Sequence, residues 1–232
     1  MLTVNSVHAG YGPVPVLHGV SFSVEKGETL VLMGRNGVGK TTLLKTAAGV
    51  IEPSSGTLQL DGVNVSGWKS HQMARHGVAY VPQGRGIFPK LSVEENLLVG
   101  LRARRDDVRE IPTEVLDMFP ILKQRMKQLG GTFSGGQQQI LALARALCGA
   151  PDLLLLDEPS EGIQPSIVIQ ISDLLRQFNR EMGLTVLVVE QNLELIRRVA
   201  TRCLVMQKGR ISEELSRESL DCDETVFEAL SH

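Results

Sequence analysis

One loop constrains this chain more than any other feature. Residues 34–41 read GRNGVGKT, which matches the phosphate-loop pattern G-x-x-x-x-G-K-[ST] in full. The apolar stretch TLVLM precedes the loop, and a helix-like stretch over residues 41–48 follows it. Successive backbone N–H groups of such a loop point at an anion, at the positive end of the helix dipole. The sequence therefore predicts a strand, a phosphate-binding loop and a helix in that order.

The residue types in the loop specify what it binds. Lys40 supplies a positive charge for the β- and γ-phosphates of a nucleotide, and the Thr41 hydroxyl suits Mg²⁺, which prefers hard oxygen ligands. The predicted nucleotide-binding residues here are Gly34, Arg35, Asn36, Gly37, Val38, Gly39, Lys40, Thr41 and Thr42.

An acidic pair ends a second apolar run. Residues 153–156 are four leucines, and Asp157 and Glu158 follow them. Ligands of an open α/β sheet bind at the carboxyl ends of its strands, where this pair is expected to lie. Asp157 is predicted to hold Mg²⁺, and Glu158 is predicted to polarise an attacking water as a general base.

Strand-like and helix-like runs alternate along the 232 residues, which predicts an α/β domain with a largely parallel core sheet. Strands are expected near residues 2–7, 19–24, 29–34, 56–62, 77–83, 152–159, 184–190 and 201–207. Helices are expected over residues 40–48, 93–104, 135–147, 165–181 and 193–199. The early turns predict an antiparallel element beside the core, and residues 84–150 predict an inserted helical subdomain within one domain spanning 1–232.

A second glycine pair begins another predicted helix. Residues 133–137 read FSGGQ, and two glycines with a serine at a helix start form a further anion site. One nucleotide does not need two such loops in one domain, so two chains arranged head to tail are expected to share each nucleotide. Here the sequence resembles the ATP-binding subunits of ABC transporters, whose signature is usually Leu-Ser-Gly-Gly-Gln. The corresponding residues are Phe133, Ser134, Gly135, Gly136 and Gln137.

The resemblance implies further roles and extends over essentially the whole chain. Gln83 matches the glutamine that joins the core to the helical subdomain and touches Mg²⁺ and water. Tyr11 matches the aromatic residue that stacks on adenine, and Val16 is expected beside the same ring. ATP and Mg²⁺ are the implied cofactors, and ATP hydrolysis is the implied activity.

Two positions depart from the family pattern. Gln191 stands where the family usually has a histidine, and Gln164 stands where a loop aspartate is usual. Both changes put full-strength, symmetric hydrolysis in doubt, although Gln191 can still bond the γ-phosphate. The runs EQN at 190–192 and PSEG at 159–162 resemble the smaller ATP-binding subunit of importers for branched-chain amino acids and for urea or short amides. Residues 33–39 and 162–165 look closest to the urea-type members.

The expected partners follow from the same resemblance. They are a second ABC ATPase subunit, identical or different, and transmembrane permeases that contact residues 84–91, with a solute-binding protein acting indirectly. No apolar run approaches the roughly 18 residues that cross a bilayer, and the N-terminus lacks a signal-peptide pattern. The chain is therefore expected at the cytoplasmic face of the membrane as a peripheral subunit. The net charge of −2 disfavours nucleic acid as a partner.

Three other functions are less compatible with the sequence than that of an importer ATPase. A soluble ABC-type ATPase acting on DNA or ribosomes would carry a long insertion or a second domain, and a phosphate-loop kinase would lack the signature. A regulatory subunit that does not hydrolyse ATP is suggested only by Gln164 and Gln191, whereas Lys40, Asp157 and Glu158 argue against it.

Overall fold

The computed structural model describes the backbone of residues 1–231 and the side chains of residues 1–229. Within this range, the larger sheet has the strand order β10-β9-β3-β8-β7-β6, and only β10 runs antiparallel to its neighbour. Its strands are β3 (Thr29–Met33), β6 (Val78–Val81), β7 (Leu153–Asp157), β8 (Thr185–Val189), β9 (Arg202–Gln207) and β10 (Arg210–Ser216). The parallel core predicted from the continuous apolar runs is confirmed.

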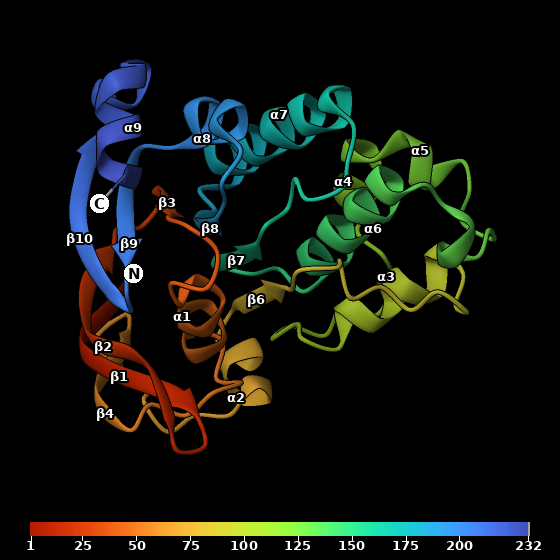
Figure 1. The fold of residues 1–232 in the computed structure, drawn as a ribbon. Helices are drawn as coiled ribbons and strands as arrows, with labels where there is room; N and C mark the ends of the chain where they lie inside the picture. The colour runs from red at the N-terminus through yellow and green to blue at the C-terminus, as the bar shows by residue number, and fades with distance from the viewer. Residues whose placement is uncertain (232) are drawn as a thin grey trace.

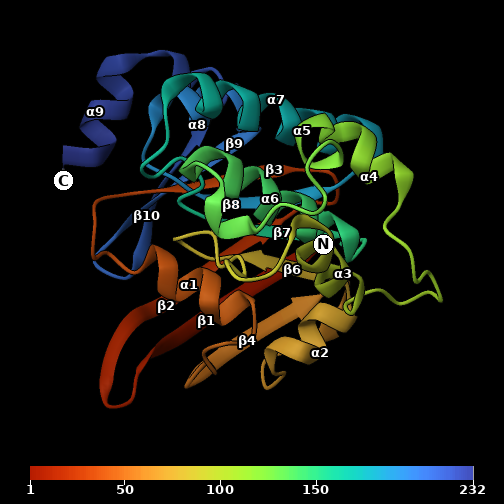
Figure 2. The ribbon, with the colours of Figure 1, turned by 90° about the vertical axis from the view of Figure 1, so that its right-hand side faces the viewer.

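The two faces of this sheet bury different side chains. In β7, Leu154 and Leu156 point into a cluster with the helices on one face, whereas Leu153 and Leu155 point into a cluster shared with the antiparallel sheet. Figure 2 shows the layers: α7 (Pro165–Met182) and α8 (Leu193–Val199) cover one face, and α1 (Lys40–Ala47) lies on the other. Burial on both faces explains why these strands are apolar throughout instead of alternating.

The early strands form a separate antiparallel sheet in the order β2-β1-β4-β5, at the left of Figure 1. These strands are β1 (Leu2–Tyr11), β2 (Val14–Val24), β4 (Ser55–Leu60) and β5 (Val63–Asn64). Buried and exposed residues alternate along much of β1, as a strand with one solvated face requires. The predicted antiparallel element is therefore present, and its first two strands extend further than the predicted runs.

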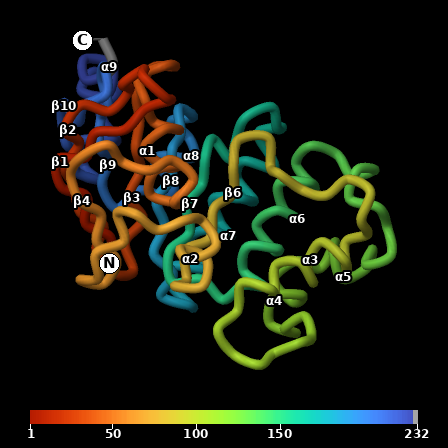
Figure 3. The backbone as a smooth tube through the Cα atoms, turned by 90° about the horizontal axis from the view of Figure 1, so that it is seen from below, coloured from red at the N-terminus to blue at the C-terminus, as the bar shows by residue number. Residues whose placement is uncertain are grey.

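Helices gather on the opposite side of the molecule, at the right of Figures 1 and 3. They are α3 (Val93–Leu101), α4 (Thr113–Met118), α5 (Pro120–Lys123) and α6 (Gly135–Cys148). Their buried side chains join the cluster beneath α7, so this region packs on the core sheet. No described helix is both long and apolar enough to cross a bilayer.

Several elements were not predicted. They are α2 (Ser70–Arg75), β5, β10 and α9 (Asp223–Ser231). The exposed edge strand β10 reads RISEELS and buries little, so its composition resembles a loop. Helix α3 ends at Leu101, three residues before the predicted end, where a loop rich in charged residues begins.

Candidate nucleotide-binding site

The phosphate loop connects β3 to α1 in a conformation that needs glycine. A Cβ built on Gly34 would lie 2.3 Å from the carbonyl oxygen of Met206, and Gly39 precedes α1 with a φ of 109°. Residues with a Cβ rarely adopt such a positive φ. The loop therefore brings its backbone close to whatever occupies the space in front of α1.

Lys40 is held inside the loop. Its Nζ donates to the carbonyl oxygens of Gly34 at 2.7 Å and of Arg35 at 2.9 Å, and lies 3.9 Å from Glu158 Oε1. Burial lowers the pKa of Lys40, and the attraction of Glu158 and other acids opposes this shift. An anion entering the loop would meet a cation that is already oriented and largely out of water.

Asp157 joins the acidic pair to the phosphate loop. Thr41 Oγ1 donates to Asp157 Oδ1 at 2.9 Å, and Tyr80 donates its hydroxyl to Oδ2 at 3.1 Å. Burial raises the pKa of Asp157, while the hydrogen bonds from Thr41 and Tyr80 lower it. The adjacent oxygens of Thr41 and Asp157 are hard donors of the kind that Mg²⁺ takes. The described residues hold no cluster of three or more His, Cys, Asp or Glu that could bind a metal ion.

Glu158 lies where three loops converge. Gln191 Nε2 donates to Glu158 Oε1 at 2.8 Å and to Asn36 Oδ1 at 2.7 Å, which links the β8 loop to the phosphate loop. Gln83 Nε2 lies 3.5 Å from Glu158 Oε2 and donates to Glu161 at 3.0 Å. Glu158 itself has a φ of 48°, a strained backbone of the kind found at functional sites.

A cavity of about 390 Å³ opens in front of these groups. Tyr11, Val16, Gln83 and Glu158 are among the residues that line it. The Tyr11 ring is 49% exposed, and Lys45 Nζ lies 5.9 Å from its centroid. An exposed aromatic ring at the cavity edge offers a flat surface for stacking. Three other predicted loop residues, Gly34, Arg35 and Val38, line a separate and smaller cavity.

The second glycine motif does not reach this cavity within the same chain. Ser134 accepts from the Gln137 N–H at 3.4 Å, and the Gln137 side chain accepts from the Ser134 N–H at 3.1 Å, which forms a capping box at the start of α6. Gly135 follows and is half-buried, and Gly136 is buried against Ile167. None of residues 133–137 lines the nucleotide-sized cavity.

The prediction that Phe133 binds nucleotide needs correction for its side chain. Phe133 is 4% exposed and belongs to the hydrophobic cluster of the helical region. Its carbonyl oxygen accepts from Gln138 at 3.0 Å. The aromatic ring therefore anchors the start of α6 and is not available for a ligand.

The two departures from the family pattern have different surroundings. Gln191 lies at the centre of the site through its contacts with Glu158 and Asn36. Gln164 precedes α7 as its N-cap residue and makes no side-chain capping bond. It does not line the cavity at the phosphate loop.

Sequence reasoning missed two polar residues that organise the site. Tyr80 reaches Asp157 from β6, and burial strongly raises the pKa of its hydroxyl. Glu190 is 3% exposed and accepts from the backbone N–H groups of Ser160, Gln191 and Asn192. An acid directly after the buried strand β8 was the available signal for Glu190, whereas Tyr80 had none beyond its place in a strand.

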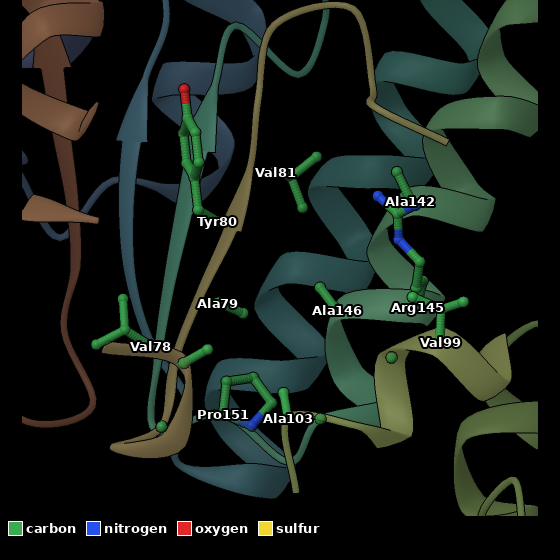
Figure 4. A pocket seen from close by; sticks show the side chains of 14 residues that line it. Val78, Ala79, Tyr80, Val81, Val99, Ala103, Ala142, Arg145, Ala146 and Pro151 are labelled. Carbon is green, nitrogen blue, oxygen red and sulfur yellow. The ribbon is translucent and has the colours of Figure 1, made fainter. Parts of the chain in front are cut away.

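A separate cavity of about 190 Å³ lies between β6, α3 and α6. Figure 4 shows Arg145 reaching along this cavity beside Val81, Val99 and Ala142. Arg145 Nη1 is buried without a hydrogen-bond partner, and its Cζ lies 5.3 Å from the centroid of the exposed Phe88 ring.

Comparison with known families agrees with this arrangement. The family model described as ABC transporter matches residues 17–161. The chain belongs to this family, and its fold and phosphate loop are those of an ATP-binding and ATP-hydrolysing subunit.

Relatives refine the comparison. The chain is 45% identical, over 91% of both proteins, to the high-affinity branched-chain amino acid transport ATP-binding protein BraG of Pseudomonas aeruginosa. It is 33% identical to the probable branched-chain amino acid transport ATP-binding protein LivF of Archaeoglobus fulgidus, over 91% of this chain and 90% of that one. The dimeric, post-hydrolysis ATP-binding cassette MJ0796 with ADP and Pi has a TM-score of 0.83 at 25% identity, covering 94% of this chain and 99% of that one.

Proposed function

We propose that this chain binds ATP at the phosphate loop and hydrolyses it with Glu158 as the general base, as one ATP-binding domain over residues 1–232. The observation that carries the proposal is that Lys40, Thr41 and Glu158 line one cavity, with Asp157 hydrogen-bonded to Thr41 at its edge. Lys40 would bind the β- and γ-phosphates. Glu158, oriented by the amides of Gln83 and Gln191, would take the proton of the attacking water.

A magnesium ion fits the same residues. Thr41 and Asp157 would hold it, and Gln83 would reach it only after leaving Glu161. When bound, the ion would neutralise charge that develops on the phosphates. The buried Asp157 carboxylate, with its pKa raised by burial, would gain a counter-charge there.

Two chains are needed to complete each site in this proposal. The signature residues Ser134, Gly135 and Gly136 lie away from the cavity of their own chain, so they would cover the nucleotide bound by a second subunit. The start of α6 supports this role, because the capping box does not use the N–H groups of Gly135 and Gly136, and such groups attract phosphate together with the helix dipole. The adenine ring would stack on Tyr11, next to Val16.

Substitution of the base tests the hydrolytic step. Glu158→Gln keeps the shape of the site and removes the proton acceptor, so we expect ATP binding to persist and turnover to fall about 10²- to 10⁴-fold. Steady-state ATPase rates and nucleotide-binding titrations of the purified variant measure both quantities. Undiminished hydrolysis would remove Glu158 as the base.

We further propose that the chain is the ATPase subunit of an importer for branched-chain amino acids, paired with a second ATPase subunit and with permeases at the cytoplasmic face of the membrane. The 45% identity to BraG over 91% of both chains supports this solute class. The urea-type assignment has no comparable support and stays a prediction.

Residues 84–91 are the proposed permease contact. Phe88 is 45% exposed there, and the neighbouring Val99 is 40% exposed at the cavity of Figure 4. An exposed apolar rim beside a cavity suits an amphipathic helix of a partner. Co-purification of the intact complex, followed by binding assays of its solute-binding protein with leucine, isoleucine, valine and urea, tests the solute. Binding of urea alone would overturn the amino acid assignment.

A further inference from the structure

Arg85 has an unusual backbone just after Gln83. Gly84, Arg85 and Gly86 have φ values of 77°, 73° and 59°, so an arginine sits between two glycines in a left-handed run. Such a φ is rare for a long side chain and persists only where the surrounding structure requires it. The Arg85 N–H donates to the Pro82 carbonyl at 3.0 Å, which fixes the turn.

The Arg85 side chain reaches the signature loop. Its Nη1 donates to Gln138 Oε1 at 3.2 Å, and Gln138 donates to the Phe133 carbonyl at 3.0 Å. A Cβ built on Gly135 would lie only 2.7 Å from Arg85 Nη2. The guanidinium group is therefore packed against the first residue of α6.

The charges at this place are unbalanced. The start of a helix carries a partial positive charge, so a guanidinium group there is repelled. Arg85 forms no ion pair with an acid among the described residues, and its hydrogen-bond partner Gln138 is neutral. A Cβ on Gly162, in the loop after the acidic pair, would lie 4.0 Å from Arg85 Nη2. An anion placed between the guanidinium and the helix start would be attracted by both.

We propose that Arg85 is a phosphate-binding residue of the signature loop and contacts the nucleotide held by the phosphate loop of the second chain. This inference rests on the proposed two-chain site. The planar guanidinium group presents several donors to phosphate oxygens in a fixed fork, which a lysine cannot do. The strained turn orients the guanidinium group, and the hydrogen bond to Gln138 holds it in place.

Heterodimers test action on the second chain. A Lys40→Ala chain binds no nucleotide but keeps Arg85 and the signature, whereas an Arg85→Ala chain binds nucleotide but lacks the guanidinium. In a heterodimer of these two chains, purified through two different tags, only the phosphate loop of the Arg85→Ala chain would bind nucleotide. That nucleotide would face the intact Arg85 of the Lys40→Ala chain. We expect the Arg85→Ala homodimer to lose at least tenfold in ATPase rate. We expect the heterodimer to match a heterodimer of Lys40→Ala with the unsubstituted chain.

A signature variant separates the inference from the proposed function. When a Gly135→Asp chain replaces the Arg85→Ala chain in the heterodimer with Lys40→Ala, the ATPase rate should be restored to the same level. If only Gly135→Asp is restored, the two-chain site stands and Arg85 acts on its own chain, which overturns the inference. If neither is restored, the two-chain site fails and the inference fails with it.

Two further variants exclude loss of folding as the cause. Arg85→Gly relieves the positive φ, so its melting temperature should be at least that of the unsubstituted protein while its KM for ATP rises. Arg85→Lys should recover only part of the rate, since it keeps the charge but not the fork. Arg109→Ala, at an exposed arginine far along the chain, is the matched control and should change neither value. Full activity of Arg85→Gly would also overturn the inference.

Discussion

Gln191 is the residue at which this site differs most from the family pattern. Its amide donates to both Glu158 and Asn36, so it orients the predicted base and connects it to the phosphate loop. An amide can do this without changing its charge, whereas a histidine can also carry a proton. Gln191 is therefore expected to position Glu158 while contributing no positive charge to the γ-phosphate.

Substitutions at Gln191 should separate these two effects. Gln191→His adds a group that can be charged, and its ATPase rate should rise about tenfold, which corresponds to about 1.4 kcal/mol of barrier. Gln191→Ala removes both hydrogen bonds and should lower the rate by a similar factor. Rates are compared for purified dimers at saturating ATP. Equal rates in all three proteins would show that residue 191 does not limit hydrolysis.

Asp157 is expected to reduce stability in the absence of ligand. Burial raises its pKa, so the charged form is disfavoured in the folded protein. A group with a raised folded pKa stabilises the fold below its ordinary pKa and loses that contribution as pH rises through the folded pKa. Asp157→Asn should therefore increase the free energy of unfolding by about 1 kcal/mol at pH 8, and the gain should shrink as the pH falls toward 4.

Urea unfolding of the nucleotide-free protein across this pH range measures the effect. Asp107→Asn provides the control, because Asp107 is exposed and should give no gain at any pH. A gain for Asp157→Asn that is constant with pH would assign the effect to packing instead of charge.

At the scale of elements, the sequence predicted best where one strong pattern decides the structure. The phosphate loop, the leucine run of β7 and the glycine pair at the start of α6 each combine a spacing with a physical requirement, and each was found in the expected place. β10 and α9 were missed because both are largely exposed and are held by tertiary contacts, such as the hydrogen bond from the Gln207 side chain to the Ala229 carbonyl. Contacts of this kind, like that between Tyr80 and Asp157, join distant segments and leave no local pattern.

The end of α7 offers a test at this scale. Gly183 follows the helix with a φ of 64°, and a Cβ there would meet no atom within 4 Å, so only the backbone conformation resists substitution. Gly183→Ala should lower the free energy of unfolding by about 1 kcal/mol, and Gly183→Asn by less, because asparagine tolerates this conformation. Gly67→Ala is the control, since Gly67 is equally uncrowded and has no positive φ. Equal values for Gly183→Ala and the control would contradict the expectation.

At the scale of the whole molecule, the sequence could predict a shared site but not its closed geometry. The signature motif and the phosphate loop were both recognised, yet within one chain residues 133–137 stay outside the cavity that Lys40 and Glu158 line. The contacts that would bring them to a nucleotide lie between chains, and a single chain contains no such contact. The partner is therefore predicted from chemistry and not from packing.

Nucleotide binding should stabilise the folded chain as a whole. At about 100 times the dissociation constant, a ligand that binds only the folded state adds about 2.7 kcal/mol. For a chain of this length that corresponds to a rise in melting temperature of about 5–10 °C. Thermal unfolding of Glu158→Gln with and without ATP and Mg²⁺ measures the shift, and Lys40→Ala should show none. A shift of similar size in Lys40→Ala would place the nucleotide elsewhere.

Glu158 touches the phosphate loop through Lys40, the β6 loop through Gln83 and the β8 loop through Gln191. These three segments are far apart in the chain, and each of them contacts this carboxylate. Displacement of one loop would leave the contacts of Glu158 with the other two intact, but it would still move the carboxylate oxygens out of position. The carboxylate is therefore in position for chemistry only when all three loops are in place.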